Sequence, residues 1–259
     1  METLDPLNLG YLALVFLMAA AFFAGFIDSV AGGGGLISLP VTLLAGLPPH
    51  LALGTGKLMS TVGTTAAFLT YARNRAIAWR VAGVGFLFAF AGSAAGSEVA
   101  LMVDNAALGK VILFLLPFAA LMTFVPVRRG AQEKKAGWPA LYVATPLFCS
   151  AIGFYDGFFG PGAGSFLLLG LHFILGLNLI AATGTAKVFN LASNISSLFV
   201  FLFNGKVYFF VAVPMALANM TGSILGSRMA LRGGPKIVRR MLLFSLGLLF
   251  VSLIWRYYN

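Results

Sequence analysis

The chain has 259 residues, of which 60% are hydrophobic and only 9% charged, and its mean hydropathy is +0.96. Soluble domains contain roughly 45–50% apolar and about 25% charged residues, so this composition excludes a water-soluble globule and predicts an all-α polytopic membrane protein. The formal net charge of +10 comes from short basic runs between apolar stretches. This placement indicates that the basic residues orient the protein in the membrane, and we expect no nucleic-acid partner.

The first half of the chain contains five apolar segments. They are residues 8–31, 36–47, 51–71, 79–100 and 108–127. The second segment would rise only about 18 Å as a helix, less than the roughly 30 Å of the hydrocarbon core. The first segment follows Glu2 and Asp5 and lacks the basic start and cleavage site of a signal peptide. We therefore expect it to stay attached to the protein.

A polar stretch then divides the chain. Residues 128–137 include Arg128, Arg129, Lys134 and Lys135 and are predicted to be a cytoplasmic basic linker. The linker separates a first membrane repeat, residues 1–127, from a second, residues 138–259. The apolar segments of the second repeat are residues 138–159, 165–177, 179–203, 207–230 and 237–255. Its second segment is again short.

The two halves repeat each other in sequence. Gly25-Phe-Ile-Asp28 returns as Gly153-Phe-Tyr-Asp156, a shift of 153 − 25 = 128 residues. Gly54-Thr-Gly-Lys57 returns as Gly184-Thr-Ala-Lys187, a shift of 184 − 54 = 130 residues that holds to the end of the chain. Such a register predicts two related units.

Basic residues predict how the segments are oriented. They follow the third segment at 73–80, fill the linker, and lie between the last two segments at 228–240. Five crossings per half with an external N-terminus place all three groups in the cytoplasm, as the positive-inside rule requires. An odd number makes the halves antiparallel, so we predict two inverted-topology repeats with ten segments in total; eight is the alternative.

Glycine-rich blocks interrupt an apolar run in each half, where glycine and proline disfavour a continuous helix. The block glycines are Gly32, Gly33, Gly34 and Gly35 in the first half and Gly160, Gly162 and Gly164 in the second. A broken helix at membrane depth exposes N–H groups that favour an anion, and matched breaks in two halves are typical of a transport site. A tight hairpin between two helices is the alternative interpretation.

A lysine recurs inside an apolar segment of each half, at Lys57 and Lys187. A charge at the centre of a spanning helix costs about 2.5–3.5 kcal/mol on insertion scales, which favours a functional role. Either side chain could instead extend to the headgroups, because each lies about six residues from a predicted helix start.

Polar residues at helical spacing follow both lysines. Ser60, Thr61 and Thr64 share a face with Lys57, and Asn190 and Asn194 share a face with Lys187. A cation heading a row of hydrogen-bond donors suits a small oxyanion.

Asp28 and Asp156 precede the glycine blocks by four residues. They are candidates for proton coupling or for ion pairing with the lysines, and a purely structural salt bridge is equally compatible with the sequence.

Pairs of glycines also occur four residues apart in each half. Gly92 with Gly96, and Gly222 with Gly226, have the spacing of closely packed helices. No Walker A, H-E-x-x-H or G-x-S-x-G motif occurs, and Cys149, His50 and His172 form no metal-ligand pattern. The sequence therefore predicts neither an enzyme nor a cofactor.

The paired blocks, Gly-Phe-Ile-Asp-Ser-Val-Ala-Gly-Gly-Gly-Gly and Gly-Phe-Tyr-Asp-Gly-Phe-Phe-Gly-Pro-Gly-Ala-Gly, together with Gly-Thr-Gly-Lys and Gly-Thr-Ala-Lys, resemble the TauE/SafE sulfite exporter family over nearly the whole chain. The resemblance implies a permease that moves sulfite, sulfoacetate or other small organosulfonates across the bacterial inner membrane. The second copy departs from the first at Pro161 and Ala186, which argues against equivalent binding by the two halves.

The combined prediction is a secondary transporter for a small sulfur anion, working by alternating access. The alternative is a non-transporting membrane scaffold or partner subunit, in which the glycines pack helices and the lysines pair with aspartates. Membrane lipid and a small anionic substrate are the predicted partners, and a homo-oligomer is left open.

Overall fold

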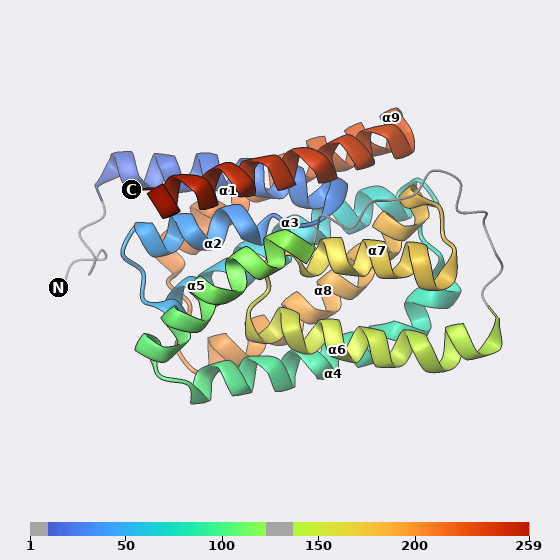
Figure 1. Ribbon diagram of the computed structural model, residues 1–259, viewed down its shortest axis with the longest axis horizontal. Helices are drawn as coiled ribbons and strands as arrows, with labels where there is room; N and C mark the ends of the chain where they lie inside the picture. The colour runs from blue at the N-terminus through green and yellow to red at the C-terminus, as the bar shows by residue number, and fades with distance from the viewer. Residues whose placement is uncertain (1–9, 123–136, 259) are drawn as a thin grey trace.

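The computed structural model describes residues 10–122 and 137–258, and these residues form helices and no strands (Figure 1). The first part of the chain forms α1 (Tyr11–Ala31), α2 (Gly35–Leu44), α3 (Pro49–Arg73), α4 (Trp79–Met102) and α5 (Asn105–Met122). A π-helical turn, Ala140–Ala144, leads into α6 (Thr145–Phe158), α7 (Ala163–Leu175), α8 (Leu179–Phe203) and α9 (Phe209–Tyr258). The predicted all-α fold is confirmed. Residues 128–136 of the predicted linker lie outside the described residues.

The second helix of each half is short, as predicted. α2 has 10 residues and α7 has 13, so they rise about 15 and 20 Å. The chain breaks before each of them at glycines with positive φ, namely Gly32 (78°), Gly33 (90°), Gly160 (97°) and Gly162 (86°). Gly35 and Gly164 lie in the first turns of α2 and α7, so these two predicted break residues belong to the following helices.

The last helix bends sharply. At Gly234, φ is 65° and ψ is −164°, values that interrupt the helical backbone of α9. Only glycine tolerates this conformation readily. The predicted boundary between the ninth and tenth segments, residues 230–237, falls at this bend.

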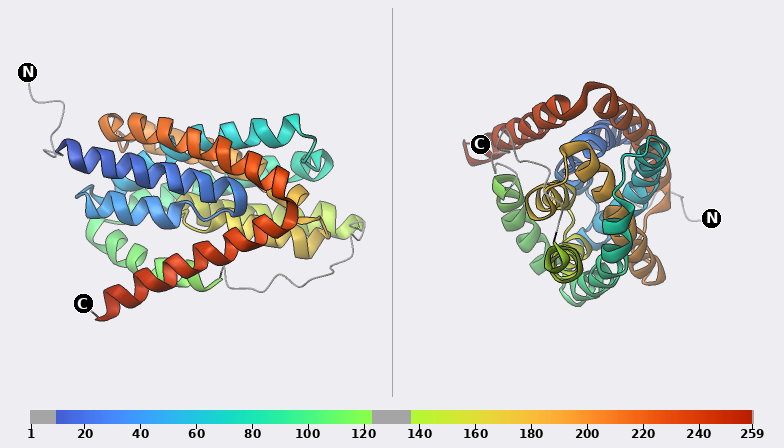
Figure 2. Two further views of the ribbon diagram at one scale, coloured as in Figure 1. Left: turned by 90° about the horizontal axis from the view of Figure 1, so that it is seen from above. Right: turned by 90° about the vertical axis from the view of Figure 1, so that its right-hand side faces the viewer.

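Most connections between helices lie at the two ends of an elongated bundle, whereas the α1–α2 and α6–α7 connections lie inside it (Figures 1 and 2). The α3–α4 and α7–α8 connections and the bend in α9 lie at one end, which we call the arginine end because Arg73, Arg75, Arg80, Arg228 and Arg232 are exposed there. The α2–α3, α4–α5 and α8–α9 connections lie at the opposite end. At the arginine end the Ala78 N–H donates to Thr185 Oγ1 (3.0 Å), and at the opposite end the Tyr208 N–H donates to Thr55 Oγ1 (3.1 Å).

Glycines allow two pairs of helices to pack closely. A side-chain carbon at Gly92 of α4 would collide with the carbonyl oxygen of Ser150 on α6, and one at Gly222 of α9 with that of Phe22 on α1. Gly96 and Gly226 meet Phe154 and Phe26 in the same way. The predicted role of these four glycines in helix packing is therefore confirmed.

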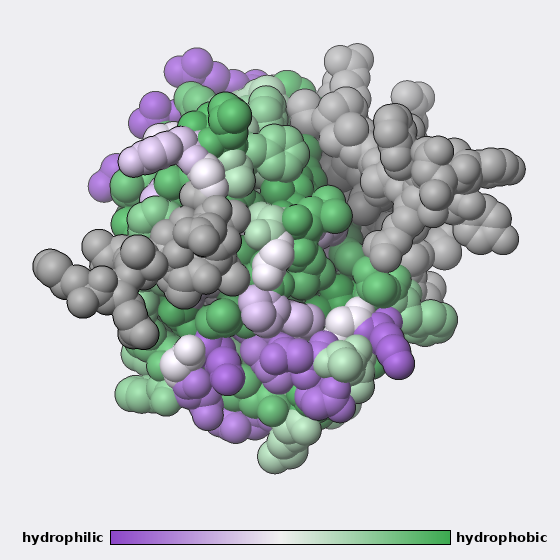
Figure 3. All heavy atoms as spheres, turned by 90° about the vertical axis from the view of Figure 1, so that its left-hand side faces the viewer, coloured by the Kyte–Doolittle hydropathy of each residue, from purple (hydrophilic) through white to green (hydrophobic). Residues whose placement is uncertain are grey.

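The outer surface is suited to lipid. Within the described residues, 4 helical stretches are long and apolar enough to cross a membrane: α1, α4, α8 and the part of α9 from Phe209 to Gly234. Large apolar side chains point outward on these and neighbouring helices; Phe16 is 63% exposed and Leu147 is 67% exposed. Figure 3 shows the end opposite the arginine end, where hydrophilic residues gather on one part of the face and hydrophobic residues cover much of the rest. The chain is an integral membrane protein.

Candidate functional site

The two glycine breaks lie against each other inside the bundle. A side-chain carbon at Gly32 would collide with Gly164 and Ser165, and one at Gly35 would lie 3.1 Å from the Pro161 Cα. The Ser165 hydroxyl donates to the carbonyl oxygen of Ala31 (3.0 Å). Segments more than 120 residues apart in sequence thus form one junction between the two halves.

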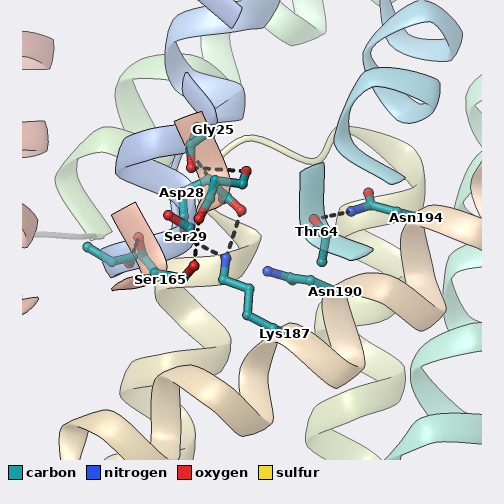
Figure 4. A network of polar contacts seen from close by, with 12 residues as sticks. Gly25, Asp28, Ser29, Thr64, Ser165, Lys187, Asn190 and Asn194 are labelled. Atoms are coloured by element: carbon teal, nitrogen blue, oxygen red, sulfur yellow. Dashed lines mark hydrogen bonds and ion pairs between the residues drawn. The ribbon is translucent and has the colours of Figure 1, made fainter. Parts of the chain in front are cut away.

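Each buried lysine pairs with the aspartate of the other half. Lys57 Nζ lies 3.0 Å from Asp156 Oδ1 and donates to the Asp156 carbonyl oxygen at 2.5 Å. Lys187 Nζ lies 2.7 Å from Asp28 Oδ2 and donates to the Asp28 carbonyl oxygen at 2.5 Å (Figure 4). Lys57 is 5% exposed and Lys187 is 1% exposed. Neither amine extends to the protein surface, so the headgroup interpretation does not hold.

The pairing changes the electrostatics expected of the site. Two ammonium groups and two carboxylates give a formal charge of zero, so the structure shows the ion pairing that the sequence had left open beside proton coupling. Burying an ion costs several kcal/mol, and an adjacent opposite charge offsets much of that cost. An anion that enters this site therefore competes with a carboxylate for each lysine.

The polar residues after Lys57 have divided roles. Thr61 donates to the Lys57 carbonyl oxygen within the same helix (2.7 Å). Thr64 accepts a long hydrogen bond from Asn194 Nδ2 (3.4 Å), and Asn194 Oδ1 accepts from Lys57 Nζ (3.4 Å). Ser60 faces a cavity.

Asn190 differs from these residues. It is only 5% exposed, and its Oδ1 has no hydrogen-bond partner within the described part of the chain. Figure 4 shows it on α8 one turn beyond Lys187, with its amide directed toward the lysine and Asp28. A buried unpaired amide oxygen costs about 1–3 kcal/mol, so it calls for a ligand or water as partner.

A cavity of about 70 Å³ joins these groups. A water molecule needs only about 10–15 Å³ on this measure, so the cavity has room for several waters or a small solute. The predicted site residues that line it are Asp28, Gly33, Gly35, Lys57, Ser60, Asp156, Gly160, Gly162, Gly164, Asn190 and Asn194. Gly32, Gly34, Thr61, Thr64 and Lys187 are predicted site residues outside its lining; Lys187 lies behind Asp28.

Three polar residues of the site were missed by the sequence analysis. Ser38 and Thr42 of α2 line the cavity, and Ser193 of α8 donates to Asp156 Oδ2. Their spacing was a usable signal, because Ser38 and Thr42 are four residues apart and Ser193 follows Asn190 by three.

The two histidines lie outside the cavity lining. His50 Nε2 contacts the Ala100 carbonyl oxygen (3.0 Å) and His172 Nδ1 contacts that of Leu177 (2.7 Å), at separate places. The part of the chain that the structure describes contains no group of three potential metal ligands.

Comparison with known proteins gives a consistent match. The family described as Sulfite exporter TauE/SafE matches residues 17–253. A probable membrane transporter protein, ORF9, of Sinorhizobium sp is 39% identical, covering 91% of this chain and 90% of its own length. A probable membrane transporter protein of Haemophilus influenzae is 36% identical, covering 91% and 92%, and the probable membrane transporter protein YfcA of Escherichia coli K12 is 33% identical, covering 97% and 91%. No solved structure matches the chain significantly.

Proposed function

Because the chain belongs to the TauE/SafE sulfite exporter family, we propose that it is a secondary transporter of the bacterial inner membrane that moves a small sulfur oxyanion or organosulfonate, such as sulfite or sulfoacetate. Relatives that align along more than nine tenths of this chain are named as probable membrane transporters, which supports transport as the activity.

One observation carries the proposal: a cavity with room for a small solute reaches buried charges in the middle of a lipid-facing bundle. The substrate would contact Lys57 directly in the cavity, and it would reach Lys187 only by displacing the Asp28 carboxylate that separates this lysine from the cavity. Ser60, Asn190 and Asn194 would donate hydrogen bonds, with backbone N–H groups at the Gly32–Gly35 and Gly160–Gly164 breaks. Thr61 and Thr64 would keep α3 and Asn194 in position.

We propose alternating access between two inverted repeats, 1–127 and 138–259, as the mechanism. Corresponding residues make corresponding contacts: Lys57 with Asp156 and Lys187 with Asp28, Thr55 with Tyr208 and Thr185 with Ala78. Among the residues whose side chains the structure describes, the exposed arginines collect at one end, which supports ten segments, with that end and the linker in the cytoplasm.

Transport by proteoliposomes tests this proposal. Lys57→Ala and Lys187→Ala should each abolish most sulfite or sulfoacetate flux, whereas the exposed Lys110→Ala should keep it. Removing one partner of a buried ion pair costs about 3–5 kcal/mol, so thermal unfolding of each variant must be measured alongside flux. Lys57→Arg and Lys187→Arg keep the charge and separate lost folding from lost binding.

A scaffold or partner subunit is the competing function, and the same assay distinguishes it. Wild-type protein that moves neither sulfite nor any organosulfonate, while remaining folded, would contradict the transporter. Full flux in both alanine variants would instead remove only the lysines from the site.

A further inference from the structure

The two ion pairs correspond by sequence but differ in their surroundings. Both oxygens of Asp156 are engaged by side-chain donors, Lys57 Nζ at Oδ1 and the Ser193 hydroxyl at Oδ2. Asp28 receives one side-chain donor, Lys187 Nζ at Oδ2, and one longer bond from the Gly34 N–H at Oδ1 (3.3 Å). Position 63 corresponds to Ser193 at the shift of 130 residues and is glycine, so Asp28 has no equivalent hydroxyl.

Access to the two carboxylates also differs. The Asp28 side chain is 25% exposed and the Asp156 side chain is 8% exposed, although both line the cavity. Water in the cavity therefore reaches Asp28 more readily. Hydrogen bonds to an ionised group are roughly twice as strong as neutral ones. Each carboxylate accepts two, but the second donor to Asp156, the Ser193 hydroxyl, lies closer than the second donor to Asp28, the Gly34 N–H, so Asp156 loses more on gaining a proton.

The groups facing Asp28 define what its protonation would do. Lys187 approaches from α8, and the Tyr71 hydroxyl of α3 donates to the neighbouring Ser29 carbonyl oxygen. Gly34 of the α1–α2 break and Gly164 of α7 lie beside it, and the neutral side chains of Asn219 and Ser223 on α9 contact Gly25, one turn earlier on α1. Lys57 and Asp156 neutralise each other across the cavity. A proton on Asp28 would thus leave Lys187 as the one uncompensated charge among these groups.

We propose that Asp28, and not Asp156, is the proton-coupling residue, so that binding of an anion beside Lys187 is accompanied by uptake of one proton from cavity water onto the Asp28 carboxylate. The anion then compensates Lys187 in place of Asp28. Release of anion and proton on the other side restores the Asp28–Lys187 pair. Asp156 and Lys57 hold the two halves together throughout. This inference depends on the proposed transport function.

The test uses sulfoacetate, whose acid groups both stay ionised near neutral pH, so that any proton moved belongs to the protein. Wild-type protein should take up protons on binding, bind more tightly as pH falls, and transport faster with a proton gradient. Asp28→Asn imitates the protonated carboxyl: its binding should lose the pH dependence, and a proton gradient should no longer stimulate flux. The exposed control Asp104→Asn should keep both the pH dependence and the stimulation, and whatever flux a folded Asp156→Asn protein retains should still be stimulated by the gradient.

Each outcome decides the inference. Wild-type binding without proton uptake would overturn it even if every variant misfolds. Loss of sulfoacetate binding in a folded Asp28→Asn protein would also overturn it, as would loss of gradient stimulation in Asp156→Asn alone. Wild-type protein that transports no organosulfonate or sulfite contradicts the proposed function itself, which is a separate result.

Discussion

Asn190 carries a buried amide oxygen that has no hydrogen-bond partner among the described residues. Its neighbour one turn along α8, Asn194, bonds to both Lys57 and Thr64, whereas Asn190 Oδ1 is buried without a partner. Folding normally leaves few such groups, because each costs about 1–3 kcal/mol. Asn190 lines the cavity, so a bound ligand that completes its hydrogen bonding would offset this free-energy cost.

Replacing Asn190 by leucine should therefore separate stability from activity. We expect Asn190→Leu to unfold at the same temperature as wild type or higher, because an unsatisfied amide is removed, while substrate binding and flux are lost. Asn194→Leu should lower the unfolding temperature, since it leaves Lys57 and Thr64 short of a partner. Thermal unfolding in detergent and a sulfoacetate binding assay measure both effects. Equal destabilisation by the two substitutions would contradict this account.

Glycines position several helices of this protein, because a residue without a side chain lets two helix backbones come into contact. α4 packs on α6 because Gly92 and Gly96 let the backbones meet, and α9 packs on α1 through Gly222 and Gly226. Small residues serve this purpose in membranes, where lipid provides no hydrophobic drive for helices to associate. Two serines of α4 add hydrogen bonds to neighbouring helices: Ser93 donates to the Ser193 carbonyl oxygen on α8 (2.7 Å), and Ser97 donates to that of Gly157 on α6 (3.1 Å).

An overpacking series on α4 tests this helix contact. Gly92→Leu should destabilise the protein by about 1–3 kcal/mol, because the added atoms collide with the Ser150 carbonyl on α6. Gly83→Ala is the matched control on the same helix, since nothing lies within 4 Å of its added carbon. It should be neutral or stabilising, by up to about 1 kcal/mol, through its higher helix propensity. Unfolding in detergent measures both, and an equal effect at the two positions would contradict the packing role.

The molecule as a whole is not symmetric about its centre in this conformation. The cavity extends along α2 and α3, past Ser38, Thr42, Leu53 and Gly56, toward the end opposite the arginines. At the shift of 130 residues Leu53 corresponds to Thr183 and Gly56 to Ala186, and both are buried, at 1% each. The cavity lining therefore includes this stretch of the first half, whereas the two corresponding residues of the second half are buried outside it, which is the asymmetry expected if the proposed alternating access operates.

Cysteine labelling tests this asymmetry. Gly56→Cys should react with a membrane-impermeant thiol reagent added from outside, because an added carbon at Gly56 meets nothing within 4 Å and the residue lines the cavity. Ala186→Cys should react slowly, and only from the cytoplasmic side. The native Cys149 is buried and provides a low background. Labelling of Gly56→Cys from the cytoplasm alone would reverse the orientation proposed here.

Much of this description follows from the sequence alone. Composition and segment length predicted an all-helical membrane protein, because lipid accepts apolar helices that satisfy their own backbone. Local conformational preference predicted the two breaks, since glycine and proline disfavour a helix wherever they occur. The repeat identified Lys57, Lys187, Asp28 and Asp156 as a set before any contact was known.

Only the tertiary structure decided which of these charges meet. Each lysine pairs with the aspartate of the opposite half, a contact between residues 99 and 159 positions apart that no local pattern encodes. Within the described residues, the different burial of Asp28 and Asp156, the unpaired Asn190 Oδ1 and the shape of the cavity all depend on how helices distant in sequence pack together. Periodicity and propensity describe one helix at a time, whereas charge compensation and cavity shape are properties of the space between helices.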